Sequence, residues 1–202
     1  MCPASTVEAD WEIELGGGAP VIDANWPGFV DLQSHPERVC ELPEVLFLPA
    51  LAPALVKLNS SESVLYTVKS DVWPITEIDP LEFDAPLPSA MHGVAVYVDC
   101  LHRNPQLWSD PNNAIAWSKK LCTALQAAPL RCCRADLVIR RAITMPSIES
   151  IGVTAYFAAC GSTDDVARMQ LEAVLAVFAD SVASVGAPST AHSKLQWEGV
   201  GE

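Results

Sequence analysis

Residues 131–142, RCCRADLVIRRA, hold a dense group of side chains that could do chemistry. Two adjacent cysteines and four arginines surround one aspartate and a short apolar run. Arginine forks match the geometry of carboxylates and phosphates, so grouped arginines are typical of an anion-binding site. The same stretch also alternates apolar and charged residues, as a strand with one charged face does. The choice between these interpretations depends on what holds these side chains and what they face.

Four predicted strands, at residues 64–73, 94–102, 133–143 and 151–160, divide their side chains into two rows. One row of each strand is mostly apolar, and we expect helices to cover it. The other row faces away from the helices and in 64–73 contains Leu65, Thr67 and Lys69. This open face would gather Lys69, Asp71, Trp73, Tyr97, Asp99, Arg134, Asp136, Arg140 and Tyr156. A single β-bulge would exchange the two rows of a strand.

Three interpretations of the open face follow from its residue types. Cations beside aromatic rings can hold a small anionic or polar molecule. The predicted ligand-binding residues are Lys69, Trp73, Tyr97, Arg134, Arg140 and Tyr156. An enzyme could instead use Asp71, Asp99 or Asp136 as acid or base in the same cleft. In the third interpretation the face is only a homodimer interface or a solvated surface, with the carboxylates neutralising the arginines as cross-strand pairs.

The cysteines and histidines do not form a metal-binding pattern. The seven cysteines include no CxxC pair, and the four histidines show no HxxxH or HxH spacing. Adjacent Cys132 and Cys133 would point to opposite faces of a strand, which places them poorly for one tetrahedral site. The glycines at 16–18 lack the lysine and the spacing of a phosphate-binding loop. We therefore expect no metal and no cofactor.

The composition excludes several classes of protein. Of 202 residues, 50% are hydrophobic and 18% are charged, which is typical of a compact globular chain. The formal net charge of −13 argues against nucleic-acid binding, which requires a basic surface. No apolar run approaches the roughly 20 residues of a membrane span, and no signal peptide is evident. We expect a cytoplasmic homodimer with neither nucleic acid nor a membrane as its partner.

The predicted elements run strand, helix, strand, strand, helix, strand, strand, helix. The first strand is expected at 8–15, and the helices at about 50–59, 112–127 and 162–185, the last two capped by Asn112 or Asn113 and by Ser162 or Thr163. Residues 20–32 suggest a loop or short strand pair, and 76–90, rich in prolines and acids, a surface loop.

The first six elements match a ferredoxin-like β-α-β-β-α-β sandwich, here extended by a further strand and a C-terminal helix. We predict an α+β fold with a largely antiparallel sheet and helices on one face. Residues 8–185 would form this single domain, and the polar residues 186–202 a flexible C-terminal tail. Architecture of this kind does not by itself predict a function.

Overall fold

The computed structural model describes residues 8–14, 19–24, 27–83, 85, 92–144 and 148–185. The strands are β1 (Glu8–Glu14), β2 (Val21–Ile22), β3 (Leu65–Ile75), β4 (His92–His102), β5 (Cys133–Thr144) and β6 (Ile148–Gly161). The α-helices are α1 (Pro43–Phe47), α2 (Leu51–Asn59), α3 (Pro111–Ala127) and α4 (Asp164–Val185). Short 3-10 helices are η1 (Pro36–Glu41), η2 (Pro80–Phe83) and η3 (Pro105–Trp108). The predicted α+β class is confirmed, and the expected tail at 186–202 lies outside the described residues.

The strands form one mixed sheet in the order β1-β5-β6-β4-β3. The neighbours among β5, β6, β4 and β3 are antiparallel, whereas β1 and β2 both pair in parallel with β5. The ferredoxin-like arrangement is not confirmed, because the sheet is mixed rather than largely antiparallel and β1 lies at its edge. Alternation along a strand is a local property, whereas the choice of a partner strand depends on residues far away in the sequence. The pattern therefore predicted the strands but not their pairing.

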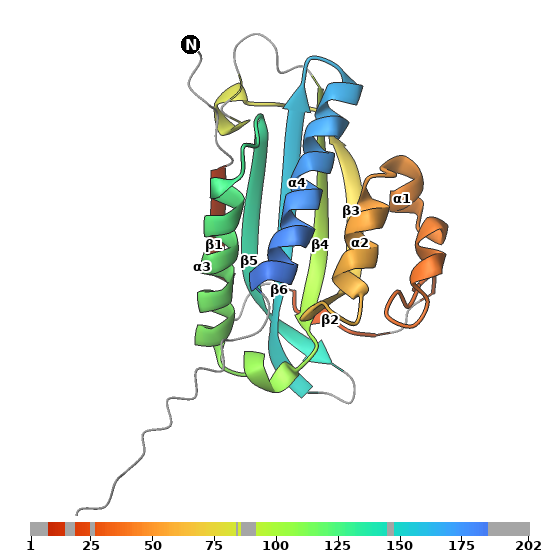
Figure 1. Ribbon diagram of the computed structural model, residues 1–202, viewed down its shortest axis with the longest axis vertical. Coiled ribbons are helices and arrows are strands. Elements are labelled where there is room, and N and C mark those ends of the chain that lie inside the picture. The colour runs from red at the N-terminus through yellow and green to blue at the C-terminus, as the bar shows by residue number, and fades with distance from the viewer. Residues whose placement is uncertain are drawn as a thin grey trace, which may run out of the picture.

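Helices α2, α3 and α4 lie side by side over one face of the sheet (Figure 1). The five α4 side chains at helical spacing are all buried: Leu171, Val174, Leu175, Phe178 and Val182. Beneath them, Leu137 and Ile139 of β5 are completely buried, and Phe157 of β6 meets Phe178 with ring centroids 4.8 Å apart. Removal of this apolar surface from water is the main driving force for folding. The predicted apolar rows of β4, β5 and β6 do face the helices.

The two long helices begin at capping side chains. Thr163 accepts a hydrogen bond from the amide of Val166 at 3.3 Å, so the predicted start of α4 is confirmed. In α3 the cap is Asp110 rather than Asn112 or Asn113, because its carboxylate accepts the amide of Asn112 at 2.9 Å. Such caps satisfy amides that have no partner within the helix. In the described ranges, no helix is both long and apolar enough to traverse a bilayer.

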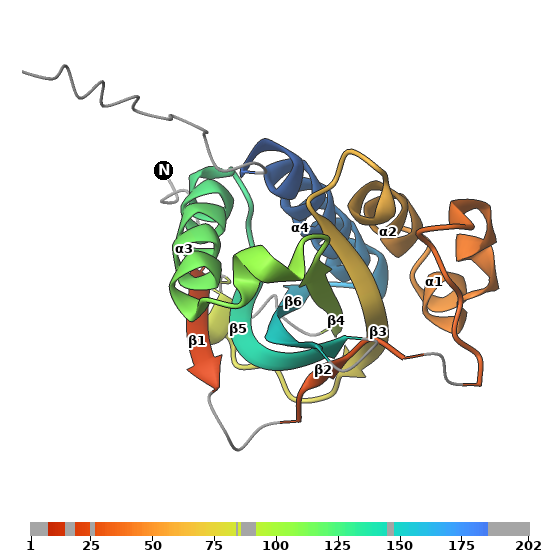
Figure 2. The same cartoon turned by 90° about the horizontal axis from the view of Figure 1, so that it is seen from below.

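The face of the sheet that α2, α3 and α4 leave uncovered carries an apolar cluster at each end. The first, here the β2 cluster, consists of Val21, Tyr66, Val68, Leu101 and Ala142. These come from four strands, because β5 bends strongly and its C-terminal end reaches β2 (Figure 2). Between the clusters the face carries mainly polar and aromatic side chains, among them Lys69, Tyr97, Asp99 and Arg140.

The second apolar cluster, here the Phe83 cluster, joins Phe83 and Cys160 to partly buried side chains around them. Part of the segment expected to be a surface loop, 76–90, therefore packs onto the sheet, and η2 lies within it. Its prolines and acids suggested exposure, but Phe83 is only 5% exposed because it anchors the segment.

Candidate functional site

The polar middle of the open face contains a cavity of about 590 Å³, here called the polar cleft. Its lining consists of Ala19, Pro20, Val21, Ile22, Lys69, Tyr97, Asp99, Arg140 and Tyr156. The last five of these residues are among those predicted for the open face. The wall formed by residues 19–22 was not predicted as part of a site, because a strand of two residues is too short to show alternation.

Strand register brings the polar side chains of the cleft together. Tyr97 of β4 lies opposite Tyr156 of β6, and Asp99 lies opposite both Lys69 of β3 and Thr154 of β6. Directly opposite residues in antiparallel strands point to the same face, with their Cβ atoms about 4.5–5.5 Å apart. The backbone pairing of β3, β4 and β6 therefore determines which side chains are neighbours in the cleft.

A β-bulge in β3 sets the direction of Lys69. The register against β4 shifts between Thr67 and Lys69. Thr67 accepts a hydrogen bond from Asn59 of α2 at 2.7 Å on the helix side, whereas Lys69 Nζ lies 5.6 Å from the ring centroid of Tyr97. The prediction that Leu65, Thr67 and Lys69 share one row was wrong, because the bulge exchanges the two rows.

Aromatic rings and cations alternate across the cleft. The centroid of Tyr97 lies 5.8 Å from that of Tyr156 and 6.1 Å from that of Trp73. Arg140 donates a hydrogen bond to the hydroxyl of Tyr156 at 3.0 Å, and its guanidinium carbon lies 5.8 Å from that ring's centroid. Cations near aromatic faces are attracted to the ring quadrupole, so these contacts hold both cations in place.

Asp99 is the carboxylate of the cleft lining. The fully buried hydroxyl of Thr154 donates to its Oδ1 atom at 2.5 Å. Burial raises the pKa of Asp99 above its usual value, against the opposing effects of the Thr154 hydrogen bond and of the Arg140 and Lys69 charges. Thr154 was not predicted as a site residue, since nothing in the alternation distinguishes a partner of a carboxylate from a solvated hydroxyl.

Lys69 and Tyr97 keep their protons at neutral pH. Burial raises the pKa of the Tyr97 hydroxyl above its usual value. A hydrogen bond with Tyr97, and beyond it the carboxylates of Asp99 and Asp71, raise the pKa of Lys69. The cleft therefore presents an ammonium, a guanidinium and phenolic hydroxyls, all of which donate hydrogen bonds.

The other predicted residues lie on the open face but outside the lining of the cleft. Arg134 Nε donates to both carboxylate oxygens of Asp136, at 2.9 and 3.1 Å, and its Nη1 lies 3.9 Å from Glu82. Asp71 is exposed and accepts the backbone amide of Val72 at 2.8 Å. The expected neutralisation of arginine by aspartate thus occurs along β5 itself, at Arg134 and Asp136. Trp73 lies beside the cleft lining, next to the Tyr97 ring.

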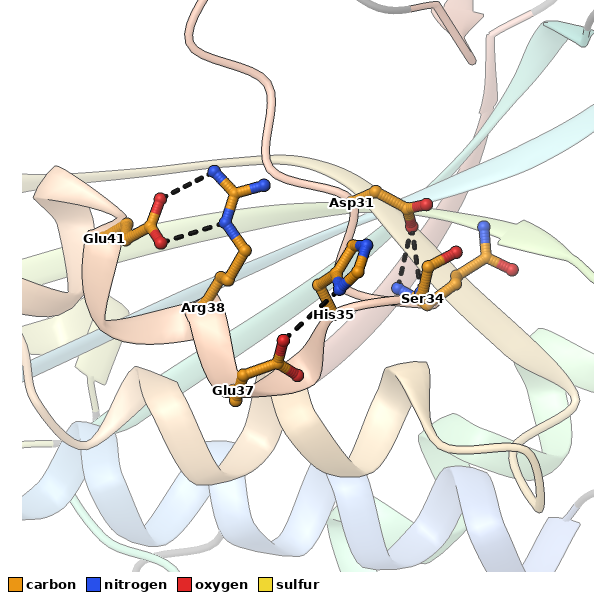
Figure 3. Close-up of polar contacts among 7 residues, drawn as sticks. Asp31, Ser34, His35, Glu37, Arg38 and Glu41 are labelled. Carbon is orange, nitrogen blue, oxygen red and sulfur yellow. Dashed lines mark hydrogen bonds and ion pairs between the residues drawn. The ribbon is translucent and has the colours of Figure 1, made fainter.

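A second group of ionisable side chains lies away from the sheet, in residues 31–41 (Figure 3). Arg38 donates two hydrogen bonds to Glu41, at 2.9 and 2.7 Å, and His35 Nδ1 lies 3.3 Å from Glu37. Asp31 accepts two amides of the turn that follows it. Asp31 is half-buried and the other side chains are exposed, and the partners are two or three residues apart, which is typical of contacts that shape a turn.

Comparison with known proteins does not suggest a ligand or a reaction for the cleft. No protein family, curated protein or solved structure matches this chain. Among the described side chains, no three histidines, cysteines, aspartates or glutamates are grouped so that they could hold a metal ion. The chemistry available in the cleft is therefore that of its cations, tyrosines and one carboxylate.

Proposed function

We propose that this protein binds a small anionic or polar molecule in the polar cleft. The supporting observation is that Lys69 and Arg140 converge with Tyr97 and Tyr156 on a single cavity of about 590 Å³. Ligand cavities commonly measure about 300–1,000 Å³ and combine apolar or aromatic walls with a few polar groups. An anionic group bound by Arg140 and Lys69, with a planar portion against the tyrosines, would use all four side chains.

The charge of the cleft supports an anionic ligand. The whole chain carries a formal net charge of −13, yet the cleft lining holds two cations and one carboxylate. Two cations against one carboxylate leave the charge balance of the cleft lining positive. A locally positive cleft in an acidic protein attracts anions while the rest of the surface repels them.

Acid–base catalysis by Asp99 in the same cleft is a second candidate function. Burial raises the pKa of Asp99, and the Thr154 hydroxyl holds its carboxylate in place. A carboxyl group with a raised pKa can exchange protons closer to neutral pH than an exposed one. Asp71 and Asp136 do not line the cavity, so this candidate rests on Asp99 alone.

We also propose that the protein is a homodimer that joins through the rim of the open face. Ile22 and Ile143 are register partners and are 44% and 38% exposed. Exposed apolar side chains at the edge of a cleft are typical of an interface, and two-fold dimers are the most common oligomers. Native mass spectrometry should show two chains for the wild type and one for Ile143→Glu. A monomeric wild type would contradict the proposal.

The test of ligand binding compares two neighbouring arginines of β5. Arg140 lines the cleft, whereas the Arg141 side chain is 55% exposed and pairs with Glu149 at 3.1 Å. Native mass spectrometry of the purified protein should show an additional mass that is lost under denaturing conditions. Arg141→Ala should keep this mass and Arg140→Ala should lose it. Equal behaviour of the two variants would contradict the proposal.

Added ligands extend the same test to an empty protein. Citrate and inorganic phosphate are suitable anionic probes in a thermal-unfolding assay. Saturation at about 100 times the dissociation constant stabilises a folded protein by about 2.7 kcal/mol. We expect stabilisation of the wild type and of Arg141→Ala, and little for Arg140→Ala. If Asp99 is catalytic, Asp99→Asn should retain a molecule of different mass from the wild type, substrate in place of product.

A further inference from the structure

Two cysteines lie opposite each other at the end of the sheet beside the Phe83 cluster. Cys133 of β5 pairs with Ala159 of β6 in antiparallel register, so the next residue outward, Cys132, lies opposite Cys160. The amide of Cys160 donates to the carbonyl of Cys132 at 2.9 Å. Opposite residues of antiparallel strands have Cα atoms about 4.5–5.5 Å apart, and a disulfide spans about 4.4–6.8 Å. The backbone therefore suits a bond between these two residues.

The side chains of this pair also share one environment. Cys132 and Cys160 both pack in the Phe83 cluster, under Ile75 and Ile78. Cys160 is 1% exposed, whereas Cys132 is only half-buried and is open to reagents. Burial and the neighbouring Cys132 thiol raise the pKa of Cys160 to about 11, as expected for two thiols close together.

The adjacent Cys133 is placed differently. Its thiol donates to the carbonyl of Arg131 at 2.8 Å and to that of Gln170 in α4 at 3.6 Å, on the helix-covered face. Burial raises its pKa to about 12. The prediction that adjacent cysteines point to opposite faces is therefore confirmed, and it leaves Cys132 as the partner of Cys160.

The backbone at Cys132 is unusual as well. Its φ angle is 52°, in the left-handed region that residues other than glycine seldom adopt. Such conformations persist where the surroundings determine them, and they concentrate at functional positions. Here the turn into β5 directs the Cys132 side chain toward β6 and away from the helices.

We propose that Cys132 and Cys160 form a reversible disulfide when the protein meets a peroxide. The Cys132 thiolate attacks one oxygen of hydrogen peroxide and breaks the O–O bond, which gives a sulfenic acid and, after proton uptake, one water. The Cys160 sulfur then attacks the sulfenic sulfur, and the hydroxyl leaves with the Cys160 proton as a second water. Two thiols are oxidised by two electrons, and these electrons reduce the peroxide. A thiol such as dithiothreitol reverses the reaction.

The experiment uses the full-length protein treated with hydrogen peroxide, blocked with N-ethylmaleimide and digested with trypsin without reduction. Trypsin cleaves after Arg131 and Arg134, so Cys132 and Cys133 share peptide 132–134, while Cys160 lies in peptide 142–168. We expect these two peptides to be linked with the loss of two hydrogen atoms and to separate on reduction. Both cysteines share one peptide, so variants are needed to show which of them forms the bond. Cys133→Ser should keep the link and Cys132→Ser should lose it.

Three results would overturn the proposal. A link that persists in Cys132→Ser would assign the bond to Cys133. Oxidation of Cys132 to sulfinic acid with no linked peptide would show that Cys160 does not reach it. Linking of the exposed Cys40 to peptide 142–168 would indicate unfolding or contact between molecules. Circular dichroism checks that the variants fold, and Cys133→Ala replaces Cys133→Ser if a buried hydroxyl prevents folding.

The pH dependence gives an independent readout. Cys160 is protonated at neutral pH because its pKa is raised to about 11. Attack on the sulfenic acid should therefore become faster as the pH rises from about 7 to about 9, since a thiolate is the attacking form. The oxidation of Cys132 also depends on pH, so the loss of the sulfenic acid must be followed separately from its formation; a rate of loss that does not change over this range would contradict the assignment of Cys160 as the second thiol.

Discussion

The polar cleft and residues 31–41 contain the same kinds of side chain in opposite settings. In residues 31–41, Arg38 and Glu41 are three residues apart and both are exposed. In the cleft, Lys69, Asp99 and Arg140 come from three different strands and meet only when the sheet has formed. An exposed local pair contributes little beyond the turn that carries it. Assembly from distant strands, rather than charge itself, is what distinguishes the candidate site.

The two regions also shift the pKa of their carboxylates in opposite directions. The hydrogen bond and charge of Arg38 lower the pKa of Glu41, because they stabilise its ionised form. Burial raises the pKa of Asp99, because the cleft favours its neutral form. The surroundings of Glu41 thus stabilise its ionised form, whereas those of Asp99 destabilise its ionised form.

The largest expected effect concerns the apolar support of the cleft wall, compared with an exposed leucine that follows residues 31–41 in the chain. Leu101 is 1% exposed within the β2 cluster, whereas Leu46 of α1 is 75% exposed. Leu101→Ala should lower the free energy of unfolding by about 2–5 kcal/mol. Leu46→Ala should change it by no more than about 0.5 kcal/mol. Urea denaturation measures both, and similar effects would mean that the β2 cluster does not support the cleft wall.

The next effect concerns the hydrogen bond that holds Asp99. Thr154→Val keeps the side-chain shape but removes the donor to a half-buried carboxylate, so it should lower the free energy of unfolding by about 1–3 kcal/mol. The matched control is Thr123→Val on α3, where an exposed hydroxyl donates to the Lys119 carbonyl at 2.9 Å. Chemical denaturation of both variants gives the comparison. If Thr123→Val lowers the free energy of unfolding by as much as Thr154→Val does, the hydrogen bond to Asp99 stabilises the fold no more than an exposed hydrogen bond does.

A smaller effect should differ in sign between the two regions as pH changes. The folded pKa of Asp99 lies above its usual value, so ionisation of Asp99 reduces stability as the pH rises from its unfolded pKa through its folded pKa. Asp99→Asn should therefore gain stability relative to the wild type over this rise in pH. Glu41 stabilises the fold above its unfolded pKa, and this contribution is lost as the pH falls.

Glu41→Gln should accordingly lose stability relative to the wild type as the pH rises from the folded pKa of Glu41 to its higher unfolded pKa, which is a lower pH range than the one in which Asp99 acts. Denaturation curves for both variants and the wild type at each pH isolate these differences from the titration of the remaining acids. Differences of the same sign for the two variants would show that the two carboxylates do not occupy opposite environments.

The smallest effect is expected for Arg38→Ala. Its partner Glu41 is exposed, and solvent and salt screen the pair. The melting temperature should fall only slightly, and by less at high salt than at low salt. A large decrease would show that the pairs of residues 31–41 support the fold as the contacts of the cleft do.

Alternation along the chain was sufficient to predict most of the candidate site. Regular strands such as β4 and β5 present every second side chain to one face, so Tyr97, Asp99 and Arg140 could be assigned from the sequence. In β3 the bulge after Thr67 interrupts this regularity, and no residue type announces it. Lys69 was assigned to the correct face because it follows the bulge.

Other features depend on contacts that a local pattern does not contain. The parallel pairing of β1 and β2 with β5 joins strands that are more than a hundred residues apart, so neither the edge position of β1 nor the wall at 19–22 could be predicted. The same applies to Phe83, whose burial depends on Cys160 and on Ile75 and Ile78. The signal in the sequence that could have predicted this burial is that Phe83 is a large hydrophobic residue within a proline-rich segment.

The parallel pairing of β1 with β5 has a consequence for how the protein is made. Glu8 pairs with Arg134, so β1 is synthesised more than a hundred residues before its partner. At about 5–20 residues per second, β1 and β2 wait several seconds for β5 to be synthesised. Pairings of such long range slow folding, and until they form the outer edge of β5 is open to strands of other chains. The wall at 19–22 arrives with these strands, so the cleft is completed only in the final stage of folding.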